Sequence, residues 1–344
     1  MHNLQGGCFV AGTLKDISKI TGFSISTVSR ALKNDPRISD KTKREILRVA
    51  RELGYKTSIE IGNDKIIMLL VANPHESMES DEFFSKVQKG ILENATKENF
   101  HYLVQTVSSI EEFDNTLVPL NLVDGIIAGG IPMPESMKNF LLKIELPVVL
   151  IGKYDGLESF PSVNNDNIRG GYLAGVEILK TYYEKVCVIT GPRSISTFSD
   201  RVEGFLKSFK ERGKSTDDIK IIELEEFDEK AGKKAVLEHE KFLRSYRTAL
   251  FCTTDWLAKG ALEELNVLKF KVPKEVGLLG FGGLSFCKHI TPKISTVSLN
   301  PYLLGKIAFL MLRELLDGNT EAKGVVFVEP TVINGETLVR GDLC

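Results

Sequence analysis

From residue 65 onward, short apolar runs alternate with longer segments in which apolar residues recur every three or four positions. The runs are rich in Val, Ile and Leu and include residues 65–72, 102–107, 124–129, 147–152, 185–191, 248–254 and 276–282. Segments with helical spacing lie between them, for example 83–97, 169–179, 199–212 and 256–265. Continuous apolar runs separated by helices are typical of parallel strands covered on both faces. The pattern therefore predicts an α/β fold with doubly wound parallel sheets, and the length allows two lobes with a cleft between them.

The first 56 residues have a different pattern, with three short helical segments between residues 13 and 56. Each segment is preceded by a residue that commonly caps helices, namely Thr13, Ser24 and Ser39. Asp16 follows Thr13 at the spacing of a capping box. Residues 21–24 are too few for a linker, so they predict the tight turn of a helix-turn-helix, whose second helix enters the DNA major groove.

Charge is distributed unevenly along the chain. Residues 1–56 contain eleven Lys and Arg against five Asp and Glu, whereas the whole chain has a net charge of −2. A basic head on an acidic body indicates attraction to a polyanion at one end, although a solvated helix surface also collects lysines. Together with the helix-turn-helix pattern, this excess favours binding to nucleic acid.

Several functional classes lack support in the sequence. No GxSxG, GxxxxGK[ST], HExxH or GxGxxG motif occurs, and the five histidines form no cluster. The five cysteines form no CxxC pair, and no apolar run approaches the 18 residues of a membrane span. We therefore expect a soluble, cytoplasmic protein that is not an enzyme, contacts no membrane and uses no cofactor or metal. Residues 1–12 show no pattern and are expected to be a disordered extension.

TLKDISKITGFSISTVSRAL at residues 13–32 and RELGY at 51–55 resemble the headpiece of LacI/GalR-family transcriptional regulators, and the likeness continues more loosely along almost the whole chain. The resemblance implies a helix-turn-helix DNA-binding domain at 13–56, a hinge at 57–64 and an effector-binding and dimerisation domain at 65–344. It places Ile25, Ser26 and Arg30 where the recognition helix reaches base edges. It places further residues at the sugar-phosphate backbone, namely Thr13, Thr27, Ser29 and Tyr55.

The chemistry of these side chains suits such roles. The guanidinium of Arg30 can donate to the O6 and N7 atoms of guanine, whereas hydroxyl groups mainly fix the register on phosphates. Ile25 can read only by shape, for example against a thymine methyl group. Val28 is better explained as a core residue, and Ser26 fits a solvated surface position equally well.

For the body, the resemblance implies a periplasmic-binding-protein-like domain in which the chain crosses between lobes three times, near Tyr182, Val297 and Glu321. The first lobe would contain residues of about 65–182 and 298–320, and the second about 183–297 and 321–340. Three segments resemble cleft elements of the family: NNDNIRGG at 164–171, RVEGF at 201–205 and TTDWLAKGA at 253–261.

These elements nominate a set of effector-binding residues. Asp166 would accept from a ligand hydroxyl, Arg201 would donate to the ligand, and Thr254 would lie near it. Aromatic cleft positions are held by Phe83, Phe84 and Phe227, which can cover an apolar sugar face. The alternatives are that Asp166 and Asp255 cap helices, that Arg201 is tied within its own lobe, and that the phenylalanines are core residues.

The chain departs from the family pattern in two places. Residues 280–283 read GFGG where the family has a GY/F-D-[DN] element, so an aspartate that accepts sugar hydroxyls is absent. Residues 57–64 contain no proline or leucine, whereas the family's hinge wedges a leucine into the minor groove and kinks the operator. We expect no wedge helix here and a less strongly bent operator.

The sequence therefore predicts a homodimeric repressor of carbohydrate metabolism genes. It would bind double-stranded, pseudo-palindromic operator DNA and respond to a sugar-like or sugar-phosphate effector between the lobes. Two alternatives stay open: a ligand-independent regulator whose α/β domain only dimerises, and a sugar-binding module with weakened operator binding.

Overall fold

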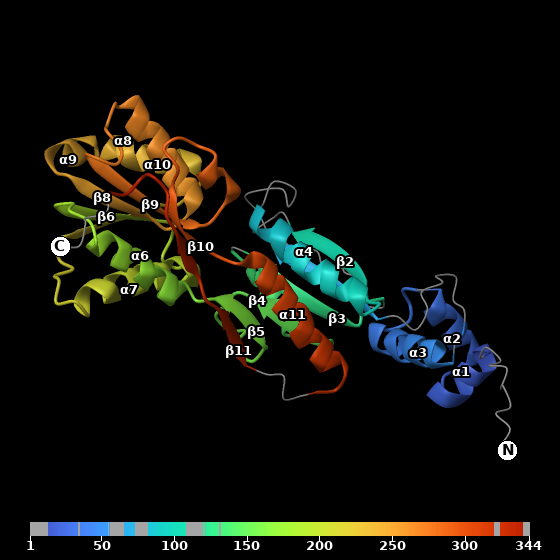
Figure 1. Ribbon diagram of the computed structural model, residues 1–344. Coiled ribbons are helices and arrows are strands. Elements are labelled where there is room, and N and C mark those ends of the chain that lie inside the picture. Colours follow the sequence, from blue (N-terminus) through green and yellow to red (C-terminus); the bar gives the residue numbers. More distant parts are fainter. Residues whose placement is uncertain are drawn as a thin grey trace, which may run out of the picture.

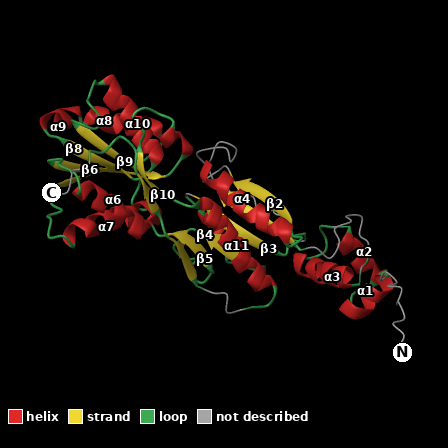
Figure 2. Cartoon of the chain, viewed as in Figure 1, coloured by secondary structure: helices red, strands yellow, loops and turns green. Residues whose placement is uncertain are grey.

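The computed structural model of the chain describes residues 13–33, 35–53, 55, 65–72, 82–107, 120, 122–130, 132–319 and 324–339. A small helical headpiece, a first α/β lobe and a second α/β lobe follow one another in space (Figures 1 and 2). The α/β fold with parallel sheets that the apolar runs predicted is confirmed. The expected disordered extension at 1–12 and the expected hinge at 57–64 lie outside the described residues.

The headpiece consists of α1 (Leu14–Thr21), α2 (Ile25–Leu32) and α3 (Asp40–Glu52). Its small core contains fully buried apolar side chains from all three helices, namely Ile17, Val28, Ala31, Ile46, Val49 and Ala50. Arg44 of α3 lies 3.6 Å from Glu145, which belongs to the first lobe. The headpiece therefore has its own core, and a surface ion pair links it to the body.

The first lobe is built on a six-stranded sheet in the order β11-β5-β4-β3-β1-β2, in which all pairs are parallel. The strands are β1 (Ile66–Ala72), β2 (His101–Val107), β3 (Gly125–Gly130), β4 (Val148–Ile151), β5 (Ser162–Asn165) and β11 (Val325–Val328). Apolar side chains of α5 (Glu135–Leu141) pack on one face. Those of α4 (Glu82–Lys97) and α11 (Pro301–Leu316) pack on the other, so the sheet is covered on both sides.

The second lobe has a sheet in the order β12-β10-β9-β8-β6-β7, in which only the β10–β12 pair is antiparallel. The strands are β6 (Lys185–Thr190), β7 (Ile219–Glu223), β8 (Thr248–Cys252), β9 (Val276–Gly282), β10 (Ser295–Ser298) and β12 (Thr331–Ile333). One face packs against α6 (Asn167–Leu179) and α7 (Ser196–Lys210). The other packs against α8 (Glu229–Glu238), α9 (Glu240–Ser245), α10 (Asp255–Val267) and the 3-10 helix η2 (Ser285–Lys288).

The chain passes between the lobes at positions that differ in part from the expected ones. The first crossing lies between β5 and α6, at residue 166, because α6 packs on α7 in the second lobe. The expectation of a crossing near Tyr182 was therefore wrong by the length of one helix. The second crossing lies between β10 and α11, at residues 299–300, beside the expected position. The third lies between β11 and β12, at residues 329–330 rather than near Glu321, because β11 pairs with β5 of the first sheet.

The backbones of α6 and α7 approach each other unusually closely. A Cβ atom at Gly204 would lie 1.9 Å from the carbonyl oxygen of Ile168, and one at Gly171 would lie 2.0 Å from that of Arg201. A Cβ at Gly175 would meet the Ser208 Oγ at 1.9 Å. Only glycine fits at these positions, so the small residues in the two helices specify their pairing.

Replacing Gly204 with Ala should therefore separate α6 from α7. We expect the second lobe to lose about 1–3 kcal/mol of stability, the usual effect of overpacking a tight interface, despite the better helix propensity of Ala. Chemical denaturation followed by circular dichroism measures this loss. Glu203→Ala, on the exposed side of the same helix turn, is the control and should leave the free energy of unfolding nearly unchanged. Equal stability of the two variants would contradict the close contact.

Candidate functional site

Side-chain caps at the start of each helix organise the headpiece, as the sequence predicted. Thr13 and Asp16 form a reciprocal capping box on α1, in which the Thr13 N–H donates to the Asp16 carboxylate at 2.8 Å. The Ser24 Oγ accepts from the Thr27 N–H at 3.1 Å at the start of α2. The Ser39 Oγ accepts from the Thr42 N–H at 3.2 Å before α3. The caps define where each helix begins and therefore the short turn that joins α1 to α2.

The second helix presents most of its predicted DNA-reading residues on one side. Ile25, Ser26 and Arg30 are exposed, and Ile25 keeps 44% of its surface accessible although it is apolar. Val28 is fully buried and anchors the opposite side of the helix in the core, as expected. Thr27 and Ser29 are half-buried. This is usual for residues at the edge of the helix face that packs on the core.

The remaining headpiece residues have structural contacts of their own. Tyr55 is half-buried against the headpiece core, and its N–H donates to the carbonyl oxygen of Ala50. The Thr13 hydroxyl donates to the Asp16 carboxylate at 2.6 Å, so a bond from this hydroxyl to a phosphate would require exchange of that contact. The structure therefore gives Thr13 a capping role, and its contact with phosphate stays a prediction.

A cavity of about 470 Å³ lies between the two lobes. It is bounded by the carboxyl ends of β3, β4 and β5 and the start of α4 from the first lobe. From the second lobe it is bounded by the starts of α6, α7 and α10 and the end of β9. Five of the six predicted effector residues line it, namely Phe83, Phe84, Arg201, Phe227 and Thr254. Carboxyl ends of parallel strands are the usual position of ligand sites in such sheets.

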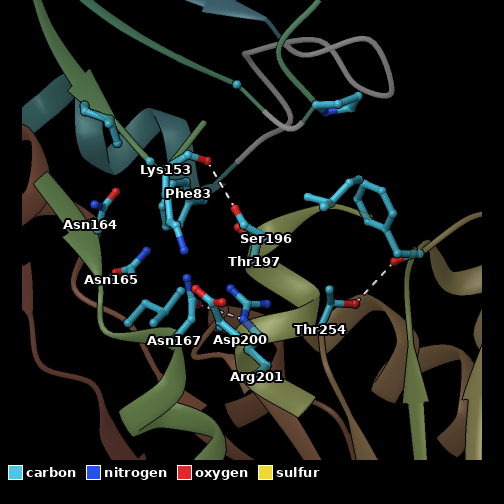
Figure 3. A pocket seen from close by; sticks show the side chains of 18 of the residues that line it. Phe83, Lys153, Asn164, Asn165, Asn167, Ser196, Thr197, Asp200, Arg201 and Thr254 are labelled. Carbon is cyan, nitrogen blue, oxygen red and sulfur yellow. Dashed lines mark hydrogen bonds between the residues drawn. The ribbon is translucent and has the colours of Figure 1, made fainter. Parts of the chain in front are cut away.

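Arg201 forms part of the cavity floor and is only 6% exposed. Its Nε donates to the Asn167 Oδ1 at 2.9 Å (Figure 3). Its Nη1 donates to the carbonyl oxygen of Thr253 at 2.6 Å. The guanidinium lies 3.9 Å from the centroid of the Phe281 ring. Burial lowers the pKa of Arg201 to about 9, against the opposing effect of Asp255 and Asp200, so the group remains charged at neutral pH.

Asp166 is placed differently from the five lining residues. It is the N-cap of α6, where its carboxylate accepts from the Arg169 N–H at 2.8 Å, and it does not line the cavity. The structure thus assigns it the capping alternative, because the first crossing of the chain falls at this residue and α6 begins immediately after it. Because Asp166 caps α6 and lies outside the cavity lining, its contact with a ligand stays a prediction.

Thr254 lines the cavity as predicted, but it also caps α10, the role that was expected of Asp255. Thr254 caps α10 by accepting from the Leu257 N–H at 3.1 Å, and it donates to the carbonyl oxygen of Phe227 at 3.2 Å. Asp255, expected to cap the helix, is instead fully buried and accepts from the Thr296 hydroxyl at 2.6 Å and the Leu284 N–H at 2.8 Å. Burial raises the pKa of Asp255, although these hydrogen bonds oppose the rise.

Asp255 packs against residues 280–283, where the chain departs from the family pattern. A Cβ at Gly280 would lie 2.4 Å from the Asp255 Oδ1, and one at Gly282 would lie 3.0 Å from its Oδ2. Gly282 and Gly283 also have φ angles of +143° and +75°, which side chains of L-residues rarely adopt. The buried carboxylate of Asp255 therefore occupies the space beside β9, and this strand offers no acceptor of its own to the cavity.

The three predicted phenylalanines belong to the cavity wall and to the core at once. Phe84 is 5% exposed and packs in the first-lobe core, with Phe83 edge-on to it at 5.4 Å between ring centroids. Phe227 packs at 5.0 Å from the Phe198 ring in the second lobe. Trp256, the chain's single tryptophan, also lines the cavity and lies 4.9 Å from Phe286. The walls of both lobes thus offer apolar faces to a ligand.

Sequence reasoning missed several polar residues of the cavity. Lys153 lies two residues after the end of β4, and its carbonyl oxygen accepts from the Ser196 Oγ of the second lobe at 3.1 Å (Figure 3). Asp200 precedes Arg201, and Asn164 and Asn165 end β5. The position of Lys153 and the asparagines at the carboxyl ends of strands was the available signal, whereas nothing in the sequence distinguished Asp200 from a solvated helix residue.

Two features are absent from the described residues, a membrane-spanning helix and a cluster of metal ligands. No helix in this part of the chain combines the length and the apolar character needed to cross a membrane. No group of three or more His, Cys, Asp or Glu side chains in the same part lies in an arrangement that could hold a metal ion.

Comparisons with known proteins agree with both parts of the structure. Residues 13–58 match the family described as bacterial regulatory proteins, lacI family, and residues 181–338 match a periplasmic binding protein-like domain. The HTH-type transcriptional regulator DegA of Bacillus subtilis is 28% identical over 299 residues, which cover 83% of this chain and 86% of DegA. The HTH-type transcriptional repressor CytR of Escherichia coli is 24% identical over 344 residues, covering 96% of each chain.

A solved structure shows the same fold. The complex of the transcriptional regulator CelR with cellobiose superposes with a TM-score of 0.71 at 21% identity, covering 95% of this chain and 99% of CelR. The helix-turn-helix and the two-lobed body thus occur together in these relatives, in the same order along the chain. The resemblance inferred from the sequence is confirmed, because residues 13–58 match the lacI family of bacterial regulatory proteins and the relatives that match along most of the chain are transcriptional regulators.

Proposed function

We propose that this protein is a transcriptional repressor of carbohydrate metabolism genes whose affinity for operator DNA depends on a sugar-like molecule bound between the lobes. The main support for the proposal is that one chain combines a capped helix-turn-helix with a cavity of about 470 Å³ between two lobes. Its aromatic walls and its buried Arg201 have the composition of a site for a small polar ligand. The repressor named CytR and the cellobiose complex of CelR support the same assignment.

Two buried polar atoms favour this reading over a ligand-independent regulator. The Oδ1 atoms of Asn164 and Asn165 have no hydrogen-bond partner among the described residues, and both asparagines line the cavity. An unpaired buried acceptor costs free energy that a bound donor would recover. A body that served only for dimerisation would have no reason to keep these acceptors at the cavity wall.

Operator binding as a homodimer in the cytoplasm is part of the proposal. One headpiece is large enough for only one half-site, so a pseudo-palindromic operator needs two. Exposed apolar side chains at the β2 edge of the first lobe, Leu103 and Val104, together with Leu92 of α4, offer a surface for a second copy. Light scattering measures the oligomeric state, and footprinting measures whether both half-sites are protected.

Two contacts between the lobes provide the means of coupling. At one side of the cavity the Ser196 Oγ donates to the carbonyl oxygen of Lys153. At the other, the Glu82 carboxylate accepts from the Ser285 N–H at 2.9 Å and from its hydroxyl at 2.8 Å. A ligand that binds better when these contacts are made stabilises this arrangement of the lobes over others, and so changes the position of the headpieces.

Arg30→Ala tests the DNA-binding part of the proposal. We expect a loss of roughly 1–3 kcal/mol in operator affinity and a relaxed preference at one base pair per half-site, because a bidentate contact to guanine is lost. Arg37→Ala removes the same charge from a side chain held by Asp35 and should change affinity little and uniformly. Gel-shift titrations on a set of operator variants measure both. A uniform loss for Arg30→Ala would mean that it contacts phosphate.

Arg201→Ala tests the ligand site. Thermal unfolding in the presence of ribose, glucose, cellobiose and their phosphate esters should show a raised melting temperature for at least one sugar with the native protein, since a ligand of the folded state stabilises it. We expect the variant to lose this shift while its affinity for operator without ligand stays nearly intact. No shift with any sugar for the native protein would favour the ligand-independent alternative.

Glu82→Gln tests the contact between the lobes. Partial burial raises the pKa of Glu82, but hydrogen bonds from Lys86 and Ser285 outweigh it, so the pKa lies below the usual 4.5. The stabilisation is therefore fully present above pH 4.5 and is lost as the pH falls through the lowered pKa. We expect the native protein to melt above the variant at pH 7 and the difference to shrink below pH 4.5. Glu135→Gln changes an exposed carboxylate that pairs with Lys138, and it should show little difference at either pH.

A further inference from the structure

The interlobe cavity is lined by more acidic than basic side chains. The cations are three, namely Lys138, Lys153 and Arg201. The carboxylates are six, namely Glu82, Asp155, Asp200, Glu226, Asp228 and Asp255. An excess of negative charge around an enclosed space disfavours a ligand that carries a phosphate dianion, because like charges repel most strongly where water is scarce.

Three of these carboxylates accept hydrogen bonds from the protein itself. Glu82 accepts from Ser285 and Lys86, Asp228 caps α8 by accepting from the Ala231 N–H, and Asp255 is held by Thr296 and Leu284. The Asp200 carboxylate differs from these three. Among the residues that the structure describes, no donor lies within hydrogen-bonding distance of it, although it is half-buried. Asp200 therefore has an acceptor available for a ligand.

The position of Asp200 suits contact with a ligand that also touches Arg201. Asp200 lies beside Arg201 and Asn167 on the second-lobe wall, and Lys153 lies on the facing first-lobe wall (Figure 3). Burial raises the pKa of Asp200 and the charge of Lys153 opposes the rise, so the two groups are close enough to interact without forming an ion pair. A molecule between these walls can contact the donors of Arg201 and Lys153 and the carboxylate acceptor of Asp200.

Adjacent hydroxyl groups satisfy such a site because each both donates and accepts. The unpaired Oδ1 atoms of Asn164 and Asn165 add two acceptors to the same cavity. Strand β9 cannot supply the acceptor from the second lobe, since a side chain at Gly282 would meet Asp255. The phosphate group of an ester mainly accepts hydrogen bonds at neutral pH, so it cannot pair with these acceptors as the hydroxyl that it replaces does.

We propose that Asp200 is a specificity-determining residue, whose carboxylate accepts from the hydroxyls of an uncharged sugar held against Arg201 and excludes the phosphate ester of the same sugar. The inference rests on the proposed function, in which the cavity binds a sugar-like ligand. It narrows that proposal to uncharged sugars and assigns the selection to one side chain.

Trp256 lines the cavity as the single tryptophan, so its fluorescence reports binding directly. Ribose, glucose and cellobiose are each titrated against their phosphate esters with the native protein. We expect the uncharged member of a pair to bind at least tenfold more tightly. Asp200→Asn should weaken the uncharged sugar about tenfold or more and narrow the gap to its ester. Asp217→Asn removes the same charge from an exposed position of the second lobe outside the cavity and should leave the preference unchanged.

The outcomes separate this inference from the proposed function. Native protein that prefers the phosphate ester, or an Asp200→Asn variant that binds the sugar like the native protein, overturns the role of Asp200 while the ligand site stands. No fluorescence or thermal response to any member of the panel overturns the ligand site and this inference together. The comparison of sugar with ester in the native protein does not depend on how well the variant folds, and thermal unfolding without ligand checks the variant.

Discussion

The close contact between the backbones of α6 and α7 positions most of the groups in the interlobe cavity. Gly171, Gly175 and Gly204 leave no side chain between the two helices. Asn167 at the start of α6 can therefore reach Arg201 on α7 at 2.9 Å. Because α6 follows β5 after one residue, the same contact ties the asparagines at the end of β5 to the Arg201 wall. The pairing of α6 with α7 thus sets the position of the asparagines of the first lobe relative to Arg201 of the second lobe.

Arg201 would be costly to bury without these neighbours. Its charge is met by a side-chain amide, a backbone carbonyl and the face of Phe281, and two carboxylates lie near enough to influence its pKa. Hydrogen bonds and a ring face offset part of the desolvation of a guanidinium, and they leave some of its five N–H donors available. The guanidinium is therefore fixed in orientation and still charged, which is the state in which it can recognise an acceptor on a ligand.

Local patterns in the sequence predicted the headpiece and the alternation of strands and helices well. The caps at Thr13, Ser24 and Ser39 depend only on neighbours in the chain, and so do the apolar runs that became strands. The lobe boundaries depend on distant contacts and were partly misplaced. The sequence does not show which lobe contains helix 167–179, because this depends on the contact of its glycines with α7. In the same way, the sequence does not show that residues 325–328 pair with β5 of the first lobe.

The candidate site could also be predicted only in part from the sequence. Arg201 and the phenylalanines followed from the resemblance, and the structure brings them together at the cavity. Asp166 and Asp255 each stand next to the start of a helix, where a carboxylate can cap, bind a loop or face a ligand. The sequence alone does not choose among these, because the choice depends on which strand or loop packs above the helix end. The glycines of β9 leave room for the Asp255 carboxylate to be buried beside that strand. Asp166 caps α6 because the chain crosses between the lobes at this residue.

The discontinuity of the first lobe has a consequence for its synthesis. Its sheet begins at residue 66, yet α11, which covers one face of that sheet, ends at residue 316, and the last strand of the sheet ends at residue 328. The apolar face formed by β1, β3 and β4 therefore has no α11 to cover it until nearly the whole chain has left the ribosome. Contacts between residues so far apart slow folding, and an uncovered apolar face is prone to aggregate. The nascent protein thus spends most of its synthesis with one complete core, that of the headpiece, and its two lobes mature almost together at the end.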